Sequence, residues 1–309
     1  MESTKSIKRR IRSVKNTAQI TKAMEVVSAT KMRKSQVFAL KARPYALASL
    51  EILTNLLERT PILPPLLQKR QIHASALLVV TSDKGLAGAF NSNVIKRAEA
   101  WIQDKQNKAK PFALVSVGKK SRDYFDRREI GIWASFSGFG DYSTLAETLP
   151  VAETIITGFL SETWDEVEAV YTNFKTTLKQ ETVLKKILPV TEEGIEEIVK
   201  TILPERGKFA KPTTYNLIPT TYNYEYKFEP SAEEILNALV PQLIRMHVHH
   251  IILESNASEH SARMVAMKSA SDNATELISE LSLSYNKARQ AGITRELTEI
   301  TAGKEVLEQ

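Results

Sequence analysis

Residues 262–301 read ARMVAMKSASDNATELISELSLSYNKARQAGITRELTEIT, and residues 5–36 read KSIKRRIRSVKNTAQITKAMEVVSATKMRKSQ. Neither segment contains proline and their only glycine is Gly292, so each is predicted to form a long helix. Each helix has only a narrow apolar stripe, which needs a partner to cover it. Two half-polar helices at opposite ends of one chain therefore predict a coiled coil between the termini.

The stripe of the N-terminal segment has the spacing of a coiled coil and then becomes polar. Its apolar positions are Ile7, Ile11, Val14 and Ala18. The same register continues through Thr21, Glu25 and Ser28, while Ile20, Met24 and Val27 are expected to face elsewhere. The C-terminal stripe is regular from Met267 onward and has many small residues, which allow close helix approach: Ala270, Ala274, Leu277, Leu281, Ser284, Ala288 and Ala291.

Between the two helical segments the pattern changes to alternating strands and helices. Strands are expected at 76–81, 112–117, 130–136, 167–173 and 182–188, and helices at 92–107, 119–127 and 144–163. This alternation predicts an α/β fold, a Rossmann-like central domain with a mostly parallel sheet.

The predicted organisation has four parts. They are an N-terminal coiled-coil helix at 1–58, a central α/β domain at 75–190, an irregular connector at 191–230 and a C-terminal coiled-coil helix at 231–305. Pro44 is expected to bend the first helix and Pro241 the last, which Ser231 should cap. A proline-rich linker occupies 59–74, and a short helix is expected at 192–202 within the connector.

The composition, 42% hydrophobic and 25% charged over 309 residues, is that of a soluble globular protein. No apolar run approaches the roughly 18–20 residues of a membrane span, and no secretory segment is found, so an intracellular location is expected. The absence of cysteine excludes disulfides, zinc fingers and thiol nucleophiles.

Charge is distributed unevenly along the chain. Residues 1–43 hold twelve Lys and Arg against Glu2 and Glu25, a balance of +10, so the other 266 residues carry −4 of the total of +6. A basic helix on a mildly acidic body predicts an anionic partner. Composition leaves open a helix that binds duplex nucleic acid, a mitochondrial transit peptide, and a helix that lies among acidic protein surfaces.

Three motifs could carry chemistry, and each has a simpler structural interpretation. TSDKGLAGAFNSN at 81–93 lies between a strand and a helix, where phosphate-binding turns occur, but lacks the GxGxxG and P-loop signatures. VGKKS at 117–121 lacks the first glycine of a P-loop. His247, His249 and His250 have no evident third metal ligand of suitable geometry. We therefore expect no catalytic residues, no metal and no cofactor.

Several stretches together resemble the γ-subunit family of F-type ATP synthases. They are IKRRIRSVKNTAQITKAMEVVSATKMRKSQ, RPYA at 43–46, TSDKGLAGAFN, and ARMVAMKSASDNATELI followed by LSYNKARQAGITRELTEI. The resemblance is strong at both ends, moderate over 76–188 and poor over 190–228. It implies a non-catalytic rotor shaft whose terminal helices form an antiparallel coiled coil inside a ring of α and β subunits. The central domain would lie at the base with the ε subunit and the membrane c ring.

The resemblance also implies partner contacts for particular residues. Met24, Arg289, Gln290, Thr294 and Glu296 match positions that meet the β subunit. Gly85, Gly88 and Asn91 in the GLAGAFN turn, with Phe228 and Glu229, match the base that meets ε and the c ring. Ala87 replaces the cysteine that many relatives have, and the cysteine pair of plant chloroplast relatives is absent. Ordinary alternatives are seam packing for Met24 and solvated surface charges for Arg289 and Glu296.

Because the resemblance starts near residue 5, the basic N-terminus is expected to belong to the mature protein. The expected location is the cytoplasmic face of a bacterial inner membrane, with the association made indirectly through the c ring and without nucleic acid. Two other classes are an α/β enzyme with helical arms, which needs a ligand at 81–93, and a basic coiled coil that binds nucleic acid with steep salt dependence.

Overall fold

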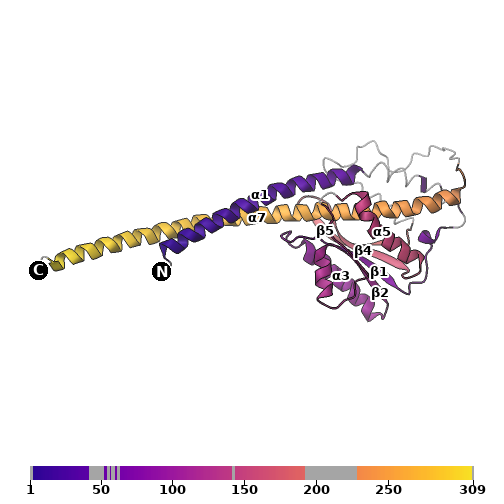
Figure 1. Cartoon of the computed structure of the whole chain (residues 1–309), viewed down its shortest axis with the longest axis horizontal. Helices are drawn as coiled ribbons and strands as arrows, with labels where there is room; N and C mark the ends of the chain where they lie inside the picture. The colour runs from indigo at the N-terminus through magenta and orange to yellow at the C-terminus, as the bar shows by residue number, and fades with distance from the viewer. Residues whose placement is uncertain are drawn as a thin grey trace. The chain divides into compact units, whose positions relative to one another are not determined.

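The computed structural model describes residues 3–41, 52–53, 56, 60, 63–140, 143–191 and 228–307 (Figure 1). The expected bend at Pro44, the RPYA stretch and the expected short helix at 192–202 lie outside the described residues. The chain divides into two compact units, which we call unit 1 (Met1–Ser28 with Arg263–Gln309) and unit 2 (Ala29–Ala262). The division falls inside both terminal helices.

Unit 1 is an antiparallel pair formed by the start of α1 (Thr4–Lys41) and the end of α7 (Ala232–Leu307) (Figure 1). The side of α1 that packs has the predicted register, with every member buried or half-buried: Ile7, Ile11, Val14, Ala18, Thr21, Glu25 and Ser28. Thr21 tolerates this position because its hydroxyl donates to the carbonyls of Thr17 and Ala18, at 3.0 and 3.1 Å. Ile20 and Val27 are exposed, as the register requires.

The seam of α7 follows its predicted register only in part. Ala274 and Leu281 are buried, and Ala270, Leu277 and Ala288 are half-buried. Ser284 is exposed while the adjacent Tyr285 is half-buried, and Ala291 is exposed, so these two seam assignments were wrong. A straight helix of 3.6 residues per turn drifts relative to a seven-residue repeat, which moves the contact face by one residue.

Unit 2 is built on a five-stranded sheet in the order β3-β2-β1-β4-β5. Its strands are β1 (Ser75–Val80), β2 (Phe112–Val117), β3 (Ala134–Phe136), β4 (Glu166–Phe174) and β5 (Gln180–Leu188). The first four strands are parallel and β5 is antiparallel to β4. The central strand β1, SALLVV, is buried along its whole length, as expected for a parallel strand covered on both faces.

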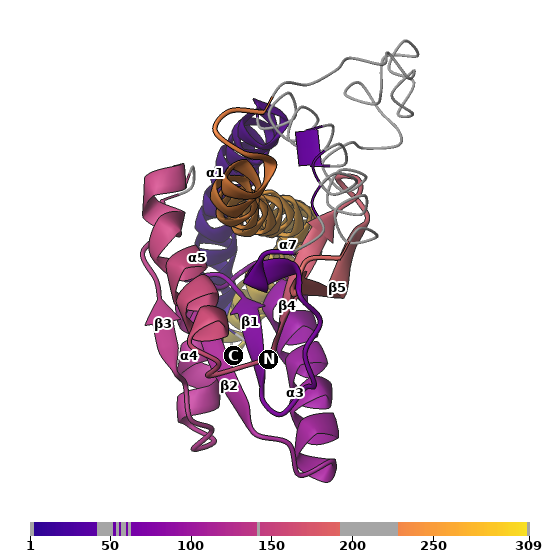
Figure 2. The ribbon, with the colours of Figure 1, turned by 90° about the vertical axis from the view of Figure 1, so that its right-hand side faces the viewer.

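Helices cover both faces of the sheet (Figure 2). On one face α3 (Phe90–Asn107) and α4 (Lys119–Asp126) pack on Leu77, Val79 and Leu114. On the other face, α5 (Leu145–Leu160) and the first part of α7 pack on Leu78, Val80, Val115 and other residues of the larger core. A short 3-10 helix, η1 (Pro65–Leu67), also contributes to this core.

The mostly parallel α/β fold was predicted correctly, and the main difference is at the sheet edge. The strand expected at 130–136 is reduced to Ala134–Phe136. The Trp133 N–H still donates to the Leu114 carbonyl at 2.8 Å, but the Ile130 N–H bonds back to the Phe125 carbonyl at 3.1 Å, so the earlier residues leave the sheet. The helix α7 continues through Pro241. Ser231 caps it as predicted, since its hydroxyl oxygen accepts from the Glu234 N–H at 3.2 Å.

Candidate partner-binding surfaces

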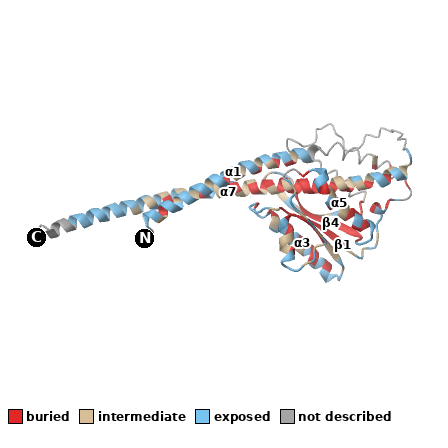
Figure 3. Ribbon diagram, viewed as in Figure 1, coloured by how far each residue is buried: buried red, intermediate tan, exposed pale blue. Residues whose placement is uncertain are grey.

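The last described part of α7 is exposed on all sides of the helix. From Arg289 to Thr301 every side chain is exposed, as the pale-blue end of the helix in Figure 3 shows. Four of the residues predicted to contact a partner lie in this segment: Arg289, Gln290, Thr294 and Glu296. Arg295 makes a surface ion pair with Glu299 at 2.8 Å. The segment therefore offers polar and charged groups that no packing in unit 1 uses.

The same segment has an exposed apolar stripe that the sequence reasoning missed. Ile293, Leu297 and Ile300 are 50%, 61% and 69% exposed, and their spacing of four and three places them on one helix face. The signal was present in the sequence as three apolar residues at helical spacing beyond the seam residue Ala288, on a face other than the seam. An apolar stripe left in water is typical of a surface that a partner covers.

On α1 the predicted contact residue Met24 is half-buried beside the seam. Its neighbours Ile20 and Val27 are exposed and lie one turn before and after it. Lys22 and Glu25 form an ion pair at 2.9 Å on the adjoining surface. Met24 is thus available in part to a partner, and the flanking apolar side chains enlarge that surface.

In unit 2 the GLAGAFN turn connects β1 to α3 in a fixed conformation. Leu86 and Gly88 have positive φ, 63° and 56°, and Gly85, Leu86 and Gly88 are exposed. Asn91 closes the turn, because its Oδ1 accepts from the Ser82 N–H at 3.0 Å and its Nδ2 donates to the Ser82 hydroxyl at 2.8 Å. Of the predicted residues here, the two glycines reach the surface while Asn91 shapes the turn.

Asp83 joins three loops at the carboxyl edge of the sheet. Its carboxylate accepts from the backbone N–H of Lys119 at 2.8 Å and of Gly138 at 2.7 Å. Lys119 is the first residue of α4, so the carboxylate occupies the helix N-terminus at which a phosphate would bind. The VGKKS turn therefore has its own internal anion, and this contact between residues 36 positions apart could not be predicted from the turn itself.

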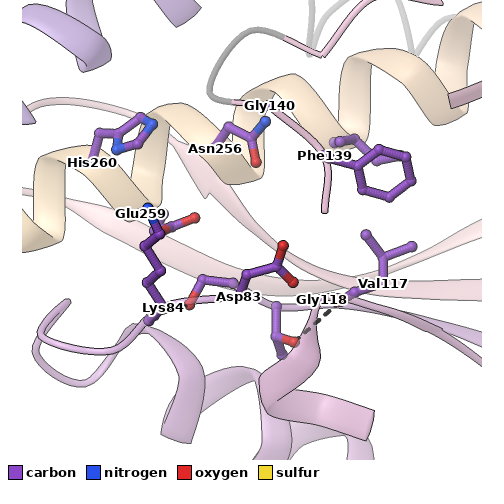
Figure 4. Close-up of a pocket in the computed structure, with 12 residues that line it drawn as sticks. Asp83, Lys84, Val117, Gly118, Phe139, Gly140, Asn256, Glu259 and His260 are labelled. Carbon is purple, nitrogen blue, oxygen red and sulfur yellow. Dashed lines mark hydrogen bonds between the residues drawn. The ribbon is translucent and has the colours of Figure 1, made fainter. Parts of the chain in front are cut away.

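A cavity of about 180 Å³ lies beside Asp83, between the loops that follow β1, β2 and β3 and the helix α7 (Figure 4). Val117, Phe139 and Ile252 give it an apolar wall. Its polar lining includes Lys84, Asn256, Glu259 and His260. Among the described residues that line it, the Ser82 hydroxyl is bonded to the Lys84 carbonyl and to Asn91 rather than to a general base.

Phe228 and Glu229 precede the long helix. Phe228 is half-buried and packs against the main core of unit 2, whereas Glu229 is exposed. Phe228 therefore has a structural role in this chain, and Glu229 is the more accessible of the two predicted base contacts.

The histidines of MHVHH are buried in unit 2. Burial, together with the nearby His250, lowers the pKa of His247 from 6.5 to about 3 and that of His249 to about 4. His249 Nδ1 lies 3.0 Å from the Thr148 hydroxyl. Among the described residues no three His, Asp or Glu side chains are arranged to hold a metal ion. None of the helices that the structure describes is both long enough and apolar enough to cross a bilayer.

Comparison with known proteins gives matches over the whole chain. A family model described as ATP synthase matches residues 3–307. The chain is 42% identical to the ATP synthase gamma chain of Roseiflexus castenholzii and 41% identical to that of Chloroflexus aurantiacus, with 99% of each chain covered. It is 39% identical to the ATP synthase gamma chain of Crocosphaera subtropica, over 99% of this chain and 100% of that one.

Solved structures share the fold. The chain is similar to a chain of the Tetrahymena thermophila mitochondrial ATP synthase central stalk/c-ring structure, with a TM-score of 0.58 and 22% identity over 82% of this chain and 99% of that one. A chain of the Euglena gracilis mitochondrial ATP synthase OSCP/F1/c-ring structure gives a TM-score of 0.60 and 19% identity over 98% and 94%.

Proposed function

Because this chain belongs to the ATP synthase gamma-chain family, we propose that it is the central rotor shaft that couples rotation of a membrane c ring to ATP synthesis or hydrolysis on β subunits. In this role the chain carries out no bond chemistry and needs no cofactor. The asymmetric coiled coil acts as an effector that biases three nucleotide sites differently, which is an allosteric coupling.

The single observation that carries the proposal is the exposed segment from Arg289 to Thr301, with its apolar stripe Ile293, Leu297 and Ile300. A surface of this kind suits a partner that surrounds the helix. The seam of unit 1 includes small and polar residues such as Thr21 and Ala274, so the helix pair is held together without a broad apolar interface.

The proposed partners are one ring of three α and three β subunits, the ε subunit and the c ring. Met24, Arg289, Gln290, Thr294 and Glu296 would meet β, and the basic surface of α1 would face acidic segments of it. The energy of electrostatic attraction decreases more slowly with distance than that of van der Waals packing. It can therefore act between the shaft and the β subunits without fixing them in one position.

The base of the shaft is proposed to use Gly85, Gly88 and Glu229 on its surface, with Asn91 and Phe228 supporting them. Contact with the c ring would make the membrane association indirect and peripheral, on the cytoplasmic face of a bacterial inner membrane.

The test is reconstitution with purified α and β subunits of the same complex. We expect one copy of this chain in each complex, measured by mass, and a stimulated rate of Mg-ATP hydrolysis. If the chain neither joins the ring nor changes turnover, the proposal is wrong. Ligand-induced thermal stabilisation would then favour an α/β enzyme, and salt-dependent DNA affinity would favour a nucleic-acid binder.

A further inference from the structure

The middle of α7 is enclosed on every side, yet much of it is polar. From residue 247 to residue 255, which we call the histidine stretch, every side chain is buried, as the red part of α7 over the sheet in Figure 3 shows. A helix buried all round is normally hydrophobic all round. Here five of the nine side chains are polar: His247, His249, His250, Glu254 and Ser255. Such a stretch needs polar partners in the core of unit 2.

These polar groups are only partly satisfied. Among the described residues, neither ring nitrogen of His250 has a hydrogen-bond partner, and the same holds for Glu254 Oε2 and Ser255 Oγ. His250 Nε2 lies 3.6 Å from Glu254 Oε1, which is close enough for an ion pair but too long for a good hydrogen bond. Buried polar groups without partners lower the stability of the packed state, so the closed arrangement of this stretch carries a cost.

Two of the histidines face neighbouring elements of unit 2. His249 Nδ1 lies 3.0 Å from the hydroxyl of Thr148, a buried residue of α5. Burial, the nearby His250 and Lys185 of β5 lower the pKa of His247 to about 3, and burial with His250 lowers the pKa of His249 to about 4. Both imidazoles are therefore neutral while α7 is packed on α5 and β5.

The packing beside the histidine stretch includes a cavity. The cavity of about 180 Å³ next to Asp83 is lined by Ile252 of the stretch and by Asn256 just after it. Side chains that line a void have no contact atoms on that side, so they add less to the packing than fully enclosed ones. Local opening of a fold begins where packing contributes least.

The charged and titratable groups around the stretch come from several elements. Glu153 on α5 pairs with Arg245 at 2.6 Å, and Asp83 accepts from two backbone N–H groups, so these two acids do little to favour protonated histidines in the closed state. The described groups are Lys185 on β5, Tyr171 on β4, Glu153 on α5, Asp83 and Lys84 at the cavity, and Arg245, His250, Glu254, Glu259 and His260 on α7.

We propose that the histidine stretch is an acid-sensitive latch, which is closed on α5 and β5 near neutral pH and opens locally as the pH falls toward 5.5. The closed state keeps the imidazoles neutral in the core, and opening exposes them to water, where they take up protons. In the proposed rotor the latch ties the α/β domain to the long helix, so acid would loosen this tie. That consequence rests on the proposed function, whereas the latch itself does not.

Proton linkage gives the direction and the size of the effect. In the open state both histidines have an ordinary pKa of 6.5, against about 3 and about 4 when closed, so the open state binds more protons below pH 6.5. Between pH 7.5 and pH 5.5 each histidine therefore favours opening by about tenfold, and the two together by about 100-fold.

The experiment is amide hydrogen exchange on the full chain at pH 7.5 and pH 5.5, corrected for the intrinsic exchange rate at each pH. We expect the protection of residues 247–255 to fall about 100-fold between the two values. The amides of β1, in the same unit, should stay at least about tenfold better protected than the stretch at pH 5.5. A common rate for both segments at both pH values would mean that acid destabilises the whole fold, and this would overturn the inference.

Variants test the proton-binding groups. His247→Gln combined with His249→Gln should reduce the fall in protection to less than about threefold, because the imidazoles that take up protons are gone. His73→Gln, at an exposed position, makes the same chemical change outside the stretch and should keep the fall of about 100-fold. A double variant with the same fall as the wild type would contradict the latch.

A second pair of variants tests the contact with α5 and does not depend on the folding of the double variant. Thr148→Val should lower the protection of the stretch at pH 7.5 at least about threefold, because the hydroxyl beside His249 is lost. Thr154→Val is the control, since its hydroxyl donates to the Pro150 carbonyl of its own helix. Equal protection in the two variants would count against the latch. A wild-type chain that shows the latch but fails to assemble with α and β subunits would contradict the rotor function alone.

Discussion

At the scale of single residues, Gly118 determines how closely the loops after β1 and β2 pack. Its φ is 92°, and a Cβ on it would lie 2.2 Å from the Thr81 carbonyl oxygen. The sequence around it looks like the end of a phosphate-binding loop, but the structure uses this glycine for a close backbone contact. The anion that the loop holds is the carboxylate of Asp83.

Gly118→Ala should destabilise unit 2 by about 2–4 kcal/mol, because the new methyl group meets backbone atoms and the φ value is unfavourable for alanine. Gly131→Ala is the matched control, since nothing lies within 4 Å of its added Cβ. Urea unfolding followed by tryptophan fluorescence measures both variants. Equal stabilities for the two would show that the close approach at Gly118 is unimportant.

The buried histidines make stability depend on pH. His247 and His249 have folded pKa values of about 3 and 4 against 6.5 when unfolded, so the unfolded state binds more protons below pH 6.5. Their contribution is fully present above pH 6.5 and is lost as the pH falls toward the folded pKa values of about 4 for His249 and about 3 for His247. Each histidine lowers the free energy of unfolding by at most about 1.4 kcal/mol per pH unit in that window.

His247→Gln should therefore flatten the decrease in stability between pH 7.5 and pH 5, measured by urea unfolding at both values. The exposed His73 offers the matched substitution, because His73→Gln makes the same chemical change without altering the buried cluster. A wild-type stability that does not change over this interval would contradict the assignment of the two depressed pKa values.

At the scale of elements, the pair α1 and α7 in unit 1 depends on a narrow seam. Thr21 and Ser28 are buried on α1, where a stable zipper would have large apolar residues. On α7, Leu281 is 9% exposed in the seam while Leu283, two residues later, is 58% exposed. The few large apolar side chains in the seam must supply much of its stability.

Leu281→Ala should destabilise the helix pair by about 2 kcal/mol or more, because a buried leucine is truncated. Leu283→Ala should change it by less than about 0.5 kcal/mol. Amide hydrogen exchange of the segment 263–288 in the full chain reports on this unit without interference from unit 2. Leu281→Ala should increase the exchange rate more than Leu283→Ala does. Faster exchange for Leu283→Ala than for Leu281→Ala would mean that the seam register is incorrect.

At the scale of the whole molecule, packing and partner contact are divided between different parts of the chain. Unit 2 has the large core that the sheet, α5 and α7 share, while in unit 1 none of the side chains described from Ser282 to Thr301 is buried. A segment without burial contributes little to stability, so substitutions there should act on the assembled complex.

Ile293→Ser combined with Leu297→Ser should leave the melting temperature of the isolated chain unchanged within about 2 °C, because both side chains are already exposed. In the reconstituted complex the same pair should lower Mg-ATP turnover severalfold. Gln290 is a proposed contact residue, so the variant Gln290→Leu should likewise impair the ATP turnover of the complex more than the stability of the isolated chain. Leu160→Ser is the control at an exposed position of unit 2, and equal losses of turnover and stability in the test variants would argue against a contact role.

The sequence alone was sufficient for the fold class and for most of the described helices and strands, the edge strand expected at 130–136 excepted. Periodicity is a local property, so the heptad from Ile7 to Ser28 and the alternation of strands and helices over 75–190 could be read from neighbouring residues. The parallel sheet followed from that alternation, because a helix between two strands returns the chain to the same edge.

The tertiary structure decided the features that depend on non-local neighbours. Asp83 meets Lys119 and Gly138 only because the strand order brings the ends of β1, β2 and β3 together, and no pattern within the turn indicates this. The exposure of Ile293 and Leu297 likewise shows only in the structure, where no described residue of the chain buries that helix face. Local sequence specifies which face of a helix is apolar, but burial of that face is determined by what the rest of the chain places against it.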